Sequence, residues 1–495
     1  MNSRLLDQRV TGQILPGWIQ GYVSVASRGK KSIFSRKSSP KSVKAFHAAK
    51  ADMKAARQAL ESNGFQIVAE SRLGLAISGP PAAFEEICHG KIVAVDRLMH
   101  AEGSRQRYVT HLDIVGEKQP SLLGHGRARS PKMKIEGILI ERPRLLQAIF
   151  PSPIPPVVDR FHLRVPDDIA VGLGAIKAHR NGIAGGGITV SMVDSGQYAH
   201  PFFDSHHYHV LPAKTIVPAT SPTKDPIGHG TGESANIFAM APEATLQPIR
   251  ATDENGHLVG AIGGFLTAKQ ESPDILTNSW GGDGPYPPNG PPDAYDIAWA
   301  AEIQDAVEQG IFVVFSGGNG SFSIEPQVPG VLAAGGTYMT GDLEMQASNY
   351  TSGYPSPWYG NRTVPDVCGL VGLSPRAQYI MLPVQPGCEL DLFESQPATG
   401  DPTGDGTTAN DGWALFSGTS AAAPQLAGIA ALILSAKPGL SPAQITEAMT
   451  KTAVDIRSGH CHPRFNYPAQ IGHDSATGHG LADSSDAVQY ALDHF

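Results

Sequence analysis

The chain has 495 residues, which is too long for one ordinary hydrophobic core, so two or three domains are expected. Its composition includes 41% hydrophobic and 17% charged residues, 55 glycines and 40 prolines. These values are typical of a loop-rich globular protein and exclude a fibrous or a disordered chain. No window approaches 18 uninterrupted apolar residues, so we expect no membrane-spanning helix.

The net charge of −8 conceals two oppositely charged parts of the chain. Residues 1–60 contain 12 Lys and Arg against 2 Asp and Glu, and the remainder contains 26 against 44. The opposite charges allow internal attraction between the two parts. The Ser-rich segment 26–40 is interpreted as a solvated basic loop, with the cations Arg28, Lys30, Lys31, Arg36 and Lys37. No recognised nucleic-acid module accompanies these cations, so nucleic acid is not expected as a partner.

Location and redox state have few sequence signals. The first 25 residues lack the basic and then apolar layout of a signal peptide, so we expect a cytoplasmic location, with export by a non-standard route left open. The four cysteines, Cys88, Cys368, Cys388 and Cys461, are too few for a disulfide framework and lack metal-ligand spacing. We favour buried thiols over a Cys368–Cys388 disulfide.

Residues 1–20 are interpreted as an N-terminal tail, followed by a small domain of alternating strands and helices. Its predicted elements are a strand at 22–25, a helix at 42–63, strands at 65–69 and 73–78, a helix at 80–88 and a strand at 91–95. The order β-α-β-β-α-β is typical of a small α+β ferredoxin-like sheet. Residues 101–130 are predicted to form an irregular loop, before another strand at 137–140.

A proline-dense linker at 150–156 marks the main domain boundary. We therefore expect an α+β domain over 21–150 and a larger domain over 151–495. Strands and helices alternate in the larger domain, which predicts an α/β fold with a parallel sheet covered by helices on both faces. The predicted strands are 187–193, 245–249, 275–277 and 311–315, and the predicted helices are 231–240, 260–271, 294–309, 420–436 and 441–452.

Four polar residues lie where such a sheet gathers its chemistry, just after a predicted strand or at the start of a predicted helix. Asp194 and Asn319 each follow a strand, and His229 and Ser420 each open a helix, all with a glycine close by. Alone, each fits an ordinary turn or helix cap. Together they supply a nucleophile, a base, a carboxylate and an oxyanion donor.

The motifs that contain these residues resemble those of the subtilisin-like serine proteases. The resemblance covers about residues 160–455, and the order Asp, His, Asn, Ser is that of the family. It rests on the motifs Val193-Asp194-Ser195-Gly196, His229-Gly230-Thr231-Gly232, Asn278-Ser279-Trp280-Gly281-Gly282, Gly318-Asn319-Gly320 and Ser417-Gly418-Thr419-Ser420-Ala421-Ala422-Ala423-Pro424.

The resemblance implies a serine endopeptidase that acts on polypeptide substrates. Ser420 would attack the scissile carbonyl, His229 would take its proton, and Asp194 would orient the imidazole. Asn319 and the Ser420 backbone N–H would bind the oxyanion. The segment expected to pair with the substrate backbone is Ser279, Trp280 and Gly281. We expect no cofactor and assign no metal: calcium sites are frequent in the family, which leaves calcium open, but none can be matched to positions here.

The small domain resembles the propeptides of these proteases by topology alone. It would then be an intramolecular inhibitor and folding chaperone, and the zymogen would cut itself within residues 142–164. The acidic segment 388–412 is interpreted as an insertion that forms a solvated lid.

Other functions remain open. A sedolisin shares the serine motif but uses a Glu–Asp pair in acid, whereas Gly228-His229-Gly230-Thr231 favours a histidine base. A catalytically silent binding protein on the same fold would have lost a member of the triad, and none is lost. A nucleic-acid-binding protein acting through the basic loop would be retained on DNA in a salt-sensitive way.

Overall fold

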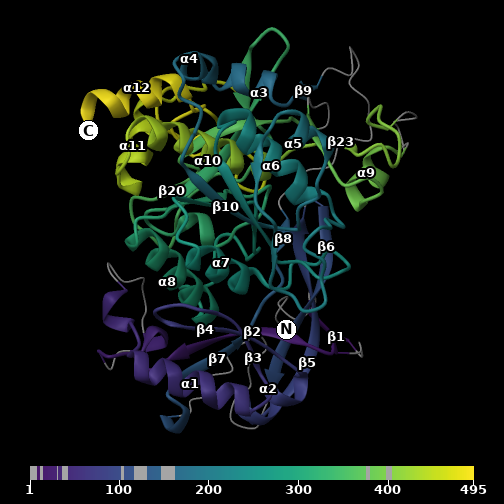
Figure 1. The fold of residues 1–495 in the computed structure, drawn as a ribbon, viewed down its shortest axis with the longest axis vertical. Helices are drawn as coiled ribbons and strands as arrows, with labels where there is room; N and C mark the ends of the chain where they lie inside the picture. Colours follow the sequence, from purple (N-terminus) through teal and green to yellow (C-terminus); the bar gives the residue numbers. More distant parts are fainter. Residues whose placement is uncertain are drawn as a thin grey trace.

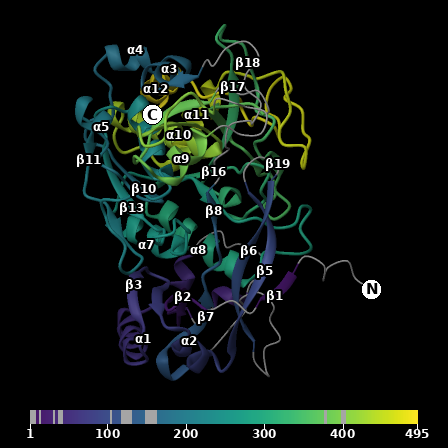
Figure 2. The ribbon, with the colours of Figure 1, turned by 90° about the vertical axis from the view of Figure 1, so that its right-hand side faces the viewer.

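The computed structural model describes residues 8–11, 15–29, 32–35, 43–101, 105–115, 131–146, 162–374, 379–396 and 404–495. Its two parts are stacked along the longest axis of the molecule (Figure 1). The N-terminal elements, drawn in purple and blue, form one end, and the elements from β9 (Leu163–Arg164) onward form the other. The second view, turned by 90°, shows the same division (Figure 2).

The larger part is built on a mainly parallel sheet with the strand order β11-β13-β10-β14-β16-β17-β18. Its parallel strands are β11 (His209–Val210), β13 (Thr245–Arg250), β10 (Thr189–Asp194), β14 (Ile275–Asn278), β16 (Phe312–Ser316) and β17 (Leu332–Met339). β12 (Lys214–Thr215) and β21 (Val367–Val371) add parallel pairs to β13 and β17, and β18 (Met345–Ala347) is antiparallel to β17. The predicted parallel sheet is confirmed.

Helices cover both faces because successive strand residues point to opposite sides. In β16, Phe312 and Val314 belong to one hydrophobic core, and Val313 and Phe315 belong to the other. The first core contains residues of α3 (Asp167–Gly172), α4 (Ala175–Arg180), α6 (His229–Met240), α10 (Thr419–Ala436), α11 (Pro442–Thr452) and α12 (Ser484–His494). The second contains residues of α7 (Ala261–Gln270) and α8 (Ala294–Glu308).

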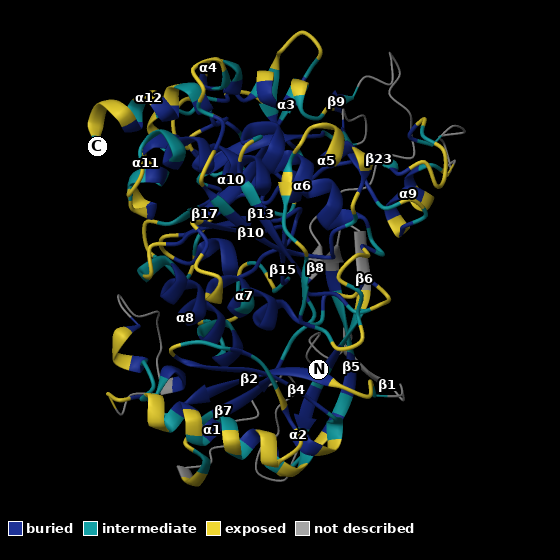
Figure 3. Ribbon diagram, viewed as in Figure 1, coloured by how far each residue is buried: buried dark blue, intermediate teal, exposed yellow. Residues whose placement is uncertain are grey.

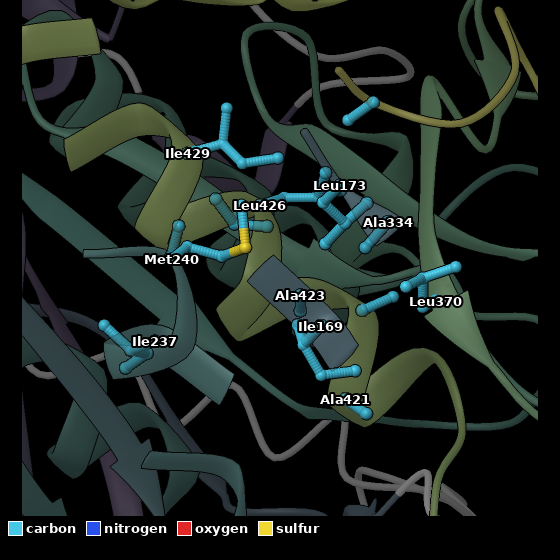
Figure 4. Close-up of a cluster of buried hydrophobic side chains, with 14 of the residues drawn as sticks. Ile169, Leu173, Ile237, Met240, Ala334, Leu370, Ala421, Ala423, Leu426 and Ile429 are labelled. Atoms are coloured by element: carbon cyan, nitrogen blue, oxygen red, sulfur yellow. The ribbon is translucent and has the colours of Figure 1, made fainter. Parts of the chain in front are cut away.

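α10 lies at the centre of the first core, where it packs against α6 and α3 (Figure 4). A Cβ on Gly428 would lie 2.6 Å from the Cβ of Met240, so the glycine allows the two helices to approach closely. α10 is the one helix in the described part that is long and apolar enough to cross a membrane, and 89% of it is buried inside the protein. Figure 3 shows this burial in dark blue, in contrast to the partly exposed α1 (Lys50–Ser62) and α12.

The N-terminal part contains an antiparallel sheet with the order β3-β4-β2-β7. Its strands are β2 (Ile19–Val25), β3 (Gln66–Glu70), β4 (Gly74–Gly79) and β7 (Ile135–Ile140). With α1 and α2 (Pro81–Cys88), these strands form the ferredoxin-like arrangement. The fourth strand is β7, however, and not the predicted strand at 91–95.

Residues 91–95 instead belong to a long hairpin of β5 (Lys91–Ala101) and β6 (Arg105–Val115), extended by β1 (Gln8–Thr11). The prediction of a loop over 101–130 is therefore wrong for residues 105–115. Polar residues such as His111 and Asp113, both buried here, conceal the strand pattern because their burial cannot be known from sequence. Residues 116–130 lie outside the described part.

The predicted helix at 42–63 starts later, at Lys50. Residues 44–46 form a 3₁₀ turn, and Ala48 then pairs with Ser27 and donates its N–H to the carbonyl of Arg72 at 2.8 Å. A hydrogen bond to the turn between two later strands thus overrides local helix propensity, which is a weak preference. Of the predicted basic loop, residues 26–29 and 32–35 are described: Ile33–Ser35 form a 3₁₀ turn, and Ile33 and Phe34 are buried, so this part is not a solvated loop. Residues 30, 31 and 36–40 lie outside the described part.

The N-terminal sheet packs one face on α7 and α8 of the larger part. Tyr22, Leu139 and Ala76 share a core with Ile262 and Phe265. The polar contacts at this surface are carried by Lys269, which pairs with Glu302 at 2.5 Å and with Asp305 at 3.2 Å. These carboxylates also bind side chains of the N-terminal part, namely His47, Tyr22, Ser71 and Arg72.

The remaining elements are short. They are α5 (Pro201–Ser205), α9 (Glu389–Glu394), β9 (Leu163–Arg164), β22 (Ile380–Pro383), β23 (Trp413–Phe416), β19 (Tyr354–Pro355), β20 (Thr363–Val364), β8 (Leu145–Leu146) and β15 (Trp280–Gly281). α9 lies in the predicted acidic lid, but Asp391 and Glu394 are buried, so this part of the segment is not a solvated lid. All four cysteines are buried free thiols.

Candidate active site

Asp194 and His229 are brought together at the carboxyl edge of the sheet. Asp194 is the last residue of β10, and His229 is the first residue of α6. The His229 Nδ1 atom lies 2.7 Å from Asp194 Oδ1, and both side chains are buried. A Cβ on Gly230 would lie 2.3 Å from the Gly196 carbonyl oxygen, so only glycine lets α6 start so close to the Asp194 turn.

Asp225, which the sequence analysis missed, fixes the relative position of these two residues. Its Oδ1 accepts from Ser195 Oγ at 2.7 Å and from the Gly228 N–H at 2.9 Å. Its Oδ2 accepts from the N–H and the hydroxyl of Thr231, at 2.8 and 2.7 Å. Four donors saturate this buried carboxylate, which ties the turn after β10 to the first turn of α6. The sequence signal that could have identified Asp225 is its position shortly before the start of α6.

The charge state of His229 follows from its neighbours. Burial lowers its pKa, but the Asp194 carboxylate, through its charge and its hydrogen bond, raises the pKa to about 9 overall. Asp194 accepts at Nδ1, so the proton of the neutral imidazole lies on Nδ1 and Nε2 is the basic atom. The pair therefore has the chemistry of an oriented general base.

Ser420 is the second residue of α10, and it is fully buried. Its Oγ donates to the carbonyl oxygen of Ser279 at 3.0 Å, and the Ser279 hydroxyl donates to the Ser420 carbonyl at 2.8 Å. Within the described residues, His229 Nε2 has no hydrogen-bond partner. The structure thus joins Asp194 to His229 and Ser420 to Ser279, without a hydrogen bond between Ser420 and His229.

Asn319 lies beside the start of α10, in the turn after β16. Its Oδ1 accepts from the N–H of Thr419 at 3.0 Å and from the Thr419 hydroxyl at 3.1 Å. Because these bonds occupy the oxygen, the Nδ2 group is the donor end of the amide. Asn319 is therefore oriented next to Ser420 by the residue that precedes the serine.

The predicted substrate-binding segment pairs with the protein's own chain. β15 pairs antiparallel with β8, with Trp280 opposite Leu146 and Gly281 opposite Leu145. The Trp280 indole N–H donates to the Val193 carbonyl at 2.7 Å, which anchors the segment to β10. An extended chain thus already lies along the edge where a substrate strand was expected.

Two arginines, the half-buried Arg142 and the buried Arg144, hold the chain that leads into β8. Arg142 pairs with Asp293 at 2.6 Å, and Arg144 lies 3.1 Å from Glu325. Both guanidinium groups also stack over the ring of Tyr295, at 4.8 and 4.9 Å from its centroid. Sequence reasoning missed these anchors because their partners are far away along the chain.

A second missed carboxyl group, Glu233, lies one helical turn after His229 and is fully buried. Its Oε1 is 3.8 Å from His229 Nε2. In the parts of the chain that the structure describes, no group of three or more His, Cys, Asp or Glu side chains is arranged to hold a metal ion.

Comparisons with known proteins match residues 185–480 to the subtilase family. Subtilisin NAT from Bacillus subtilis subsp. natto is 27% identical over 303 residues, which cover 58% of this chain and 66% of that protein. Subtilisin from Bacillus pumilus is 26% identical over 307 residues, covering 59% and 93%. The chain thus spans just under two thirds of the first relative.

Among the solved structures that are similar to this chain, one is matched over nearly the whole of it. It is fervidolysin from Fervidobacterium pennivorans, described as a keratinolytic enzyme related to subtilisin. The TM-score is 0.56 at 18% identity, with 98% of this chain and 63% of that chain covered. At this identity the likeness concerns the fold. The family match includes Asp194, His229, Asn319 and Ser420 and extends over more than half of the sequence, and the chain therefore belongs to the subtilase family.

Proposed function

We propose that the protein is a serine endopeptidase in which Ser420, His229 and Asp194 act together. The observation that carries the proposal is the 2.7 Å contact between His229 Nδ1 and Asp194 Oδ1, at the sheet edge where α10 presents Ser420. The contact orients Nε2 as a base, and the start of α10 supplies the positive end of a helix dipole at the serine. Membership of the subtilase family supports the same assignment.

In the proposed reaction, the Ser420 hydroxyl turns from the Ser279 carbonyl toward His229 Nε2. Its oxygen attacks the substrate carbonyl carbon while Nε2 takes the hydroxyl proton. Asn319 Nδ2 and the Ser420 N–H donate to the oxyanion, and the imidazolium, stabilised by Asp194, returns its proton to the leaving amine. Water then repeats the sequence on the acyl group and regenerates the serine.

The proposal includes autoprocessing, with the N-terminal part as intramolecular inhibitor. Support comes from the pairing of β8 with β15 and from the burial of the three side chains, of which Asp194 and His229 are 1% exposed and Ser420 is fully buried. A substrate could not reach Ser420 while this arrangement persists. Polypeptides would become substrates only after the N-terminal part has left.

The register of β8 narrows the predicted cleavage range of 142–164. Arg142 and Arg144 are anchored, and Leu146 pairs with Trp280. Trp280 directly follows Ser279, whose carbonyl oxygen accepts from Ser420 Oγ, so the N-terminal chain comes close to the nucleophile at the end of β8. We therefore place the proposed cut beyond Leu146, which narrows the predicted range to residues 147–164.

The test compares the wild-type protein with Ser420→Ala, by intact mass and by hydrolysis of an unfolded protein substrate. The wild type should lose an N-terminal segment that extends at least to Leu146 and should digest the substrate, and Ser420→Ala should remain at 52.2 kDa and be inactive. Ser435→Ala, at the far end of the same helix, is the matched control and should behave as wild type. Equal activity of Ser420→Ala would contradict the proposal, and inactivity of all three would favour a binding protein.

A further inference from the structure

The imidazole of His229 lies between two carboxyl groups. Asp194 binds Nδ1, and Glu233 lies near the opposite nitrogen, with its Oε1 3.8 Å from Nε2. Glu233 is four residues after His229 in α6, which puts both side chains on one face of the helix. The distance to Nε2 is that of an ion pair and is too long for a hydrogen bond.

The two facing atoms have no other partner in the described part of the protein: neither Glu233 Oε1 nor His229 Nε2 makes a hydrogen bond there. A buried carboxyl oxygen without a donor is costly, so its retention beside the catalytic imidazole calls for a reason.

The position of Glu233 is fixed by a chain of side-chain amides. Its Oε2 accepts from Asn236 Nδ2 at 2.9 Å, and Asn236 Oδ1 accepts from Gln425 Nε2 at 3.0 Å. Gln425 in turn binds the backbone N–H and carbonyl of Leu370 in β21, at 2.7 and 3.1 Å. Because Gln425 belongs to α10, the helix that carries Ser420 holds Glu233 against His229.

The titratable groups around His229 and Glu233 are acidic. His229 is influenced by Asp194 of β10, by Glu233 of α6 and by Asp225 of the preceding turn. Burial raises the pKa of Tyr350, and the nearby Glu233 carboxylate also acts to raise it. Phe416 of β23, whose ring lies near the His229 imidazole, and Gln425 of α10, which binds Glu233 through Asn236, carry no charge. Burial also raises the pKa of Glu233, so that the carboxyl group retains a proton near neutrality.

We propose that Glu233 is a positioning residue for the peptidase reaction: it shares one proton with His229 and so sets the pH at which His229 can act as a base. In one form Glu233 is a carboxylic acid and His229 is a neutral base. In the other form the proton has moved from Oε1 to Nε2, which gives a carboxylate and an imidazolium that cannot accept the Ser420 proton. This inference rests on the proposed function of Ser420 and His229.

The sharing has a defined signature in the pH dependence. Two groups that exchange a proton at this distance titrate in two coupled steps, and the apparent pKa values belong to the pair. kcat/KM of the wild type should therefore rise with pH in two steps as first one and then the second proton leaves. Glu233→Gln keeps the shape of the side chain and removes the titrating group. Its profile should have a single step, displaced to lower pH by about 1–3 units relative to the upper wild-type step.

The experiment measures kcat/KM of the processed enzyme for a peptide substrate across the range in which carboxyl and imidazole groups titrate. Glu243→Gln is the matched control, because this acid is exposed just beyond the end of α6, and it should retain both steps. A Glu233→Gln profile that superimposes on the wild-type profile, or that is lowered equally at every pH, would overturn the proposal. If Glu233→Gln fails to fold, the wild type alone provides the test, because a wild-type profile with a single step would overturn the proposal.

A second measurement separates this inference from the proposed function. In the full-length Ser420→Ala protein, the NMR resonance of the His229 Nδ1 proton reports the imidazole charge without any need for activity. Adding Glu233→Gln should shift the titration midpoint of this resonance to lower pH, and an unchanged midpoint would refute the coupling. If the midpoint shifts but the wild type has no Ser420-dependent activity, only the proposed function fails.

Discussion

Arg144 is the residue through which the hold of the N-terminal part on the catalytic cleft can best be tested. Its guanidinium group lies 3.1 Å from the Glu325 carboxylate, and the two side chains are 5% and 0% exposed. The two groups do not form an aligned hydrogen bond, so charge attraction is the main contact. Arg144→Met keeps much of the apolar stem but leaves Glu325 buried and unpaired.

The expected cost follows from this burial. Removing one partner of a buried ion pair costs about 3–5 kcal/mol, and we take about 3 kcal/mol because the hydrogen bond is absent. If this cost falls on the docked state alone, the N-terminal product should bind the processed enzyme about 100-fold more weakly. Arg142, whose pair with Asp293 is more exposed, should contribute less.

The assay follows the appearance of peptidase activity after autoprocessing. A tightly bound product delays activity, so Arg144→Met should shorten the delay and raise the inhibition constant of the released product. Arg57→Met is the control, because the ion pairs of Arg57, with Glu61 and Glu70, lie within the N-terminal part. An unchanged inhibition constant for Arg144→Met, or an equal change for Arg57→Met, would refute the role of the Arg144–Glu325 pair.

Four further predictions test other parts of the account. Asp194→Asn should lower kcat about 10⁴-fold, a magnitude borrowed from another serine protease, because Nδ1 loses its carboxylate, and steady-state kinetics will measure it. Burial raises the pKa of Glu141 to about 8 in the docked state, although a hydrogen bond from the Ile262 N–H at 2.6 Å acts in the opposite direction. Docking of the N-terminal part should therefore weaken as pH rises from the ordinary carboxyl pKa to about 8, and Glu141→Gln should flatten the pH dependence of product release. Gly428→Ala would set a Cβ 2.6 Å from that of Met240 and should destabilise the protein by about 1–3 kcal/mol, measured by denaturant unfolding. Removal of divalent cations with a chelator should leave peptidase activity unchanged, since no metal is proposed, and a loss restored by calcium would contradict this.

Local sequence patterns predicted the elements that carry the site. The apolar run after Ser420 is helical because it can be buried on all sides, and α10 is indeed buried nearly throughout. The strand before Asp194 was recognisable from its β-branched and apolar residues, and β10 ends at that aspartate. His229 and Ser420 could then be predicted as site residues, because each lies at the start of a helix, where polar groups gather beside the carboxyl ends of the strands.

The failures concern contacts between distant parts of the chain. Nothing in the local sequence distinguishes Glu233. It is held by Asn236, which is in turn bound by Gln425, 189 residues further along the chain. The pairing of β8 with β15 joins residues far apart in sequence, and a two-residue strand has no periodicity to detect. The hairpin of β5 and β6 escaped detection because tertiary burial, and not hydrophobicity, places His111 and Asp113 inside.

The most direct test of the central claim is covalent labelling of the processed protein with a fluorophosphonate, which reacts with a serine hydroxyl activated by a neighbouring base. We expect one adduct, located on Ser420 by peptide mass spectrometry, and its loss in His229→Ala. An adduct on another residue, or labelling of Ser420 that is unchanged in His229→Ala, would contradict the cooperation of serine, histidine and aspartate.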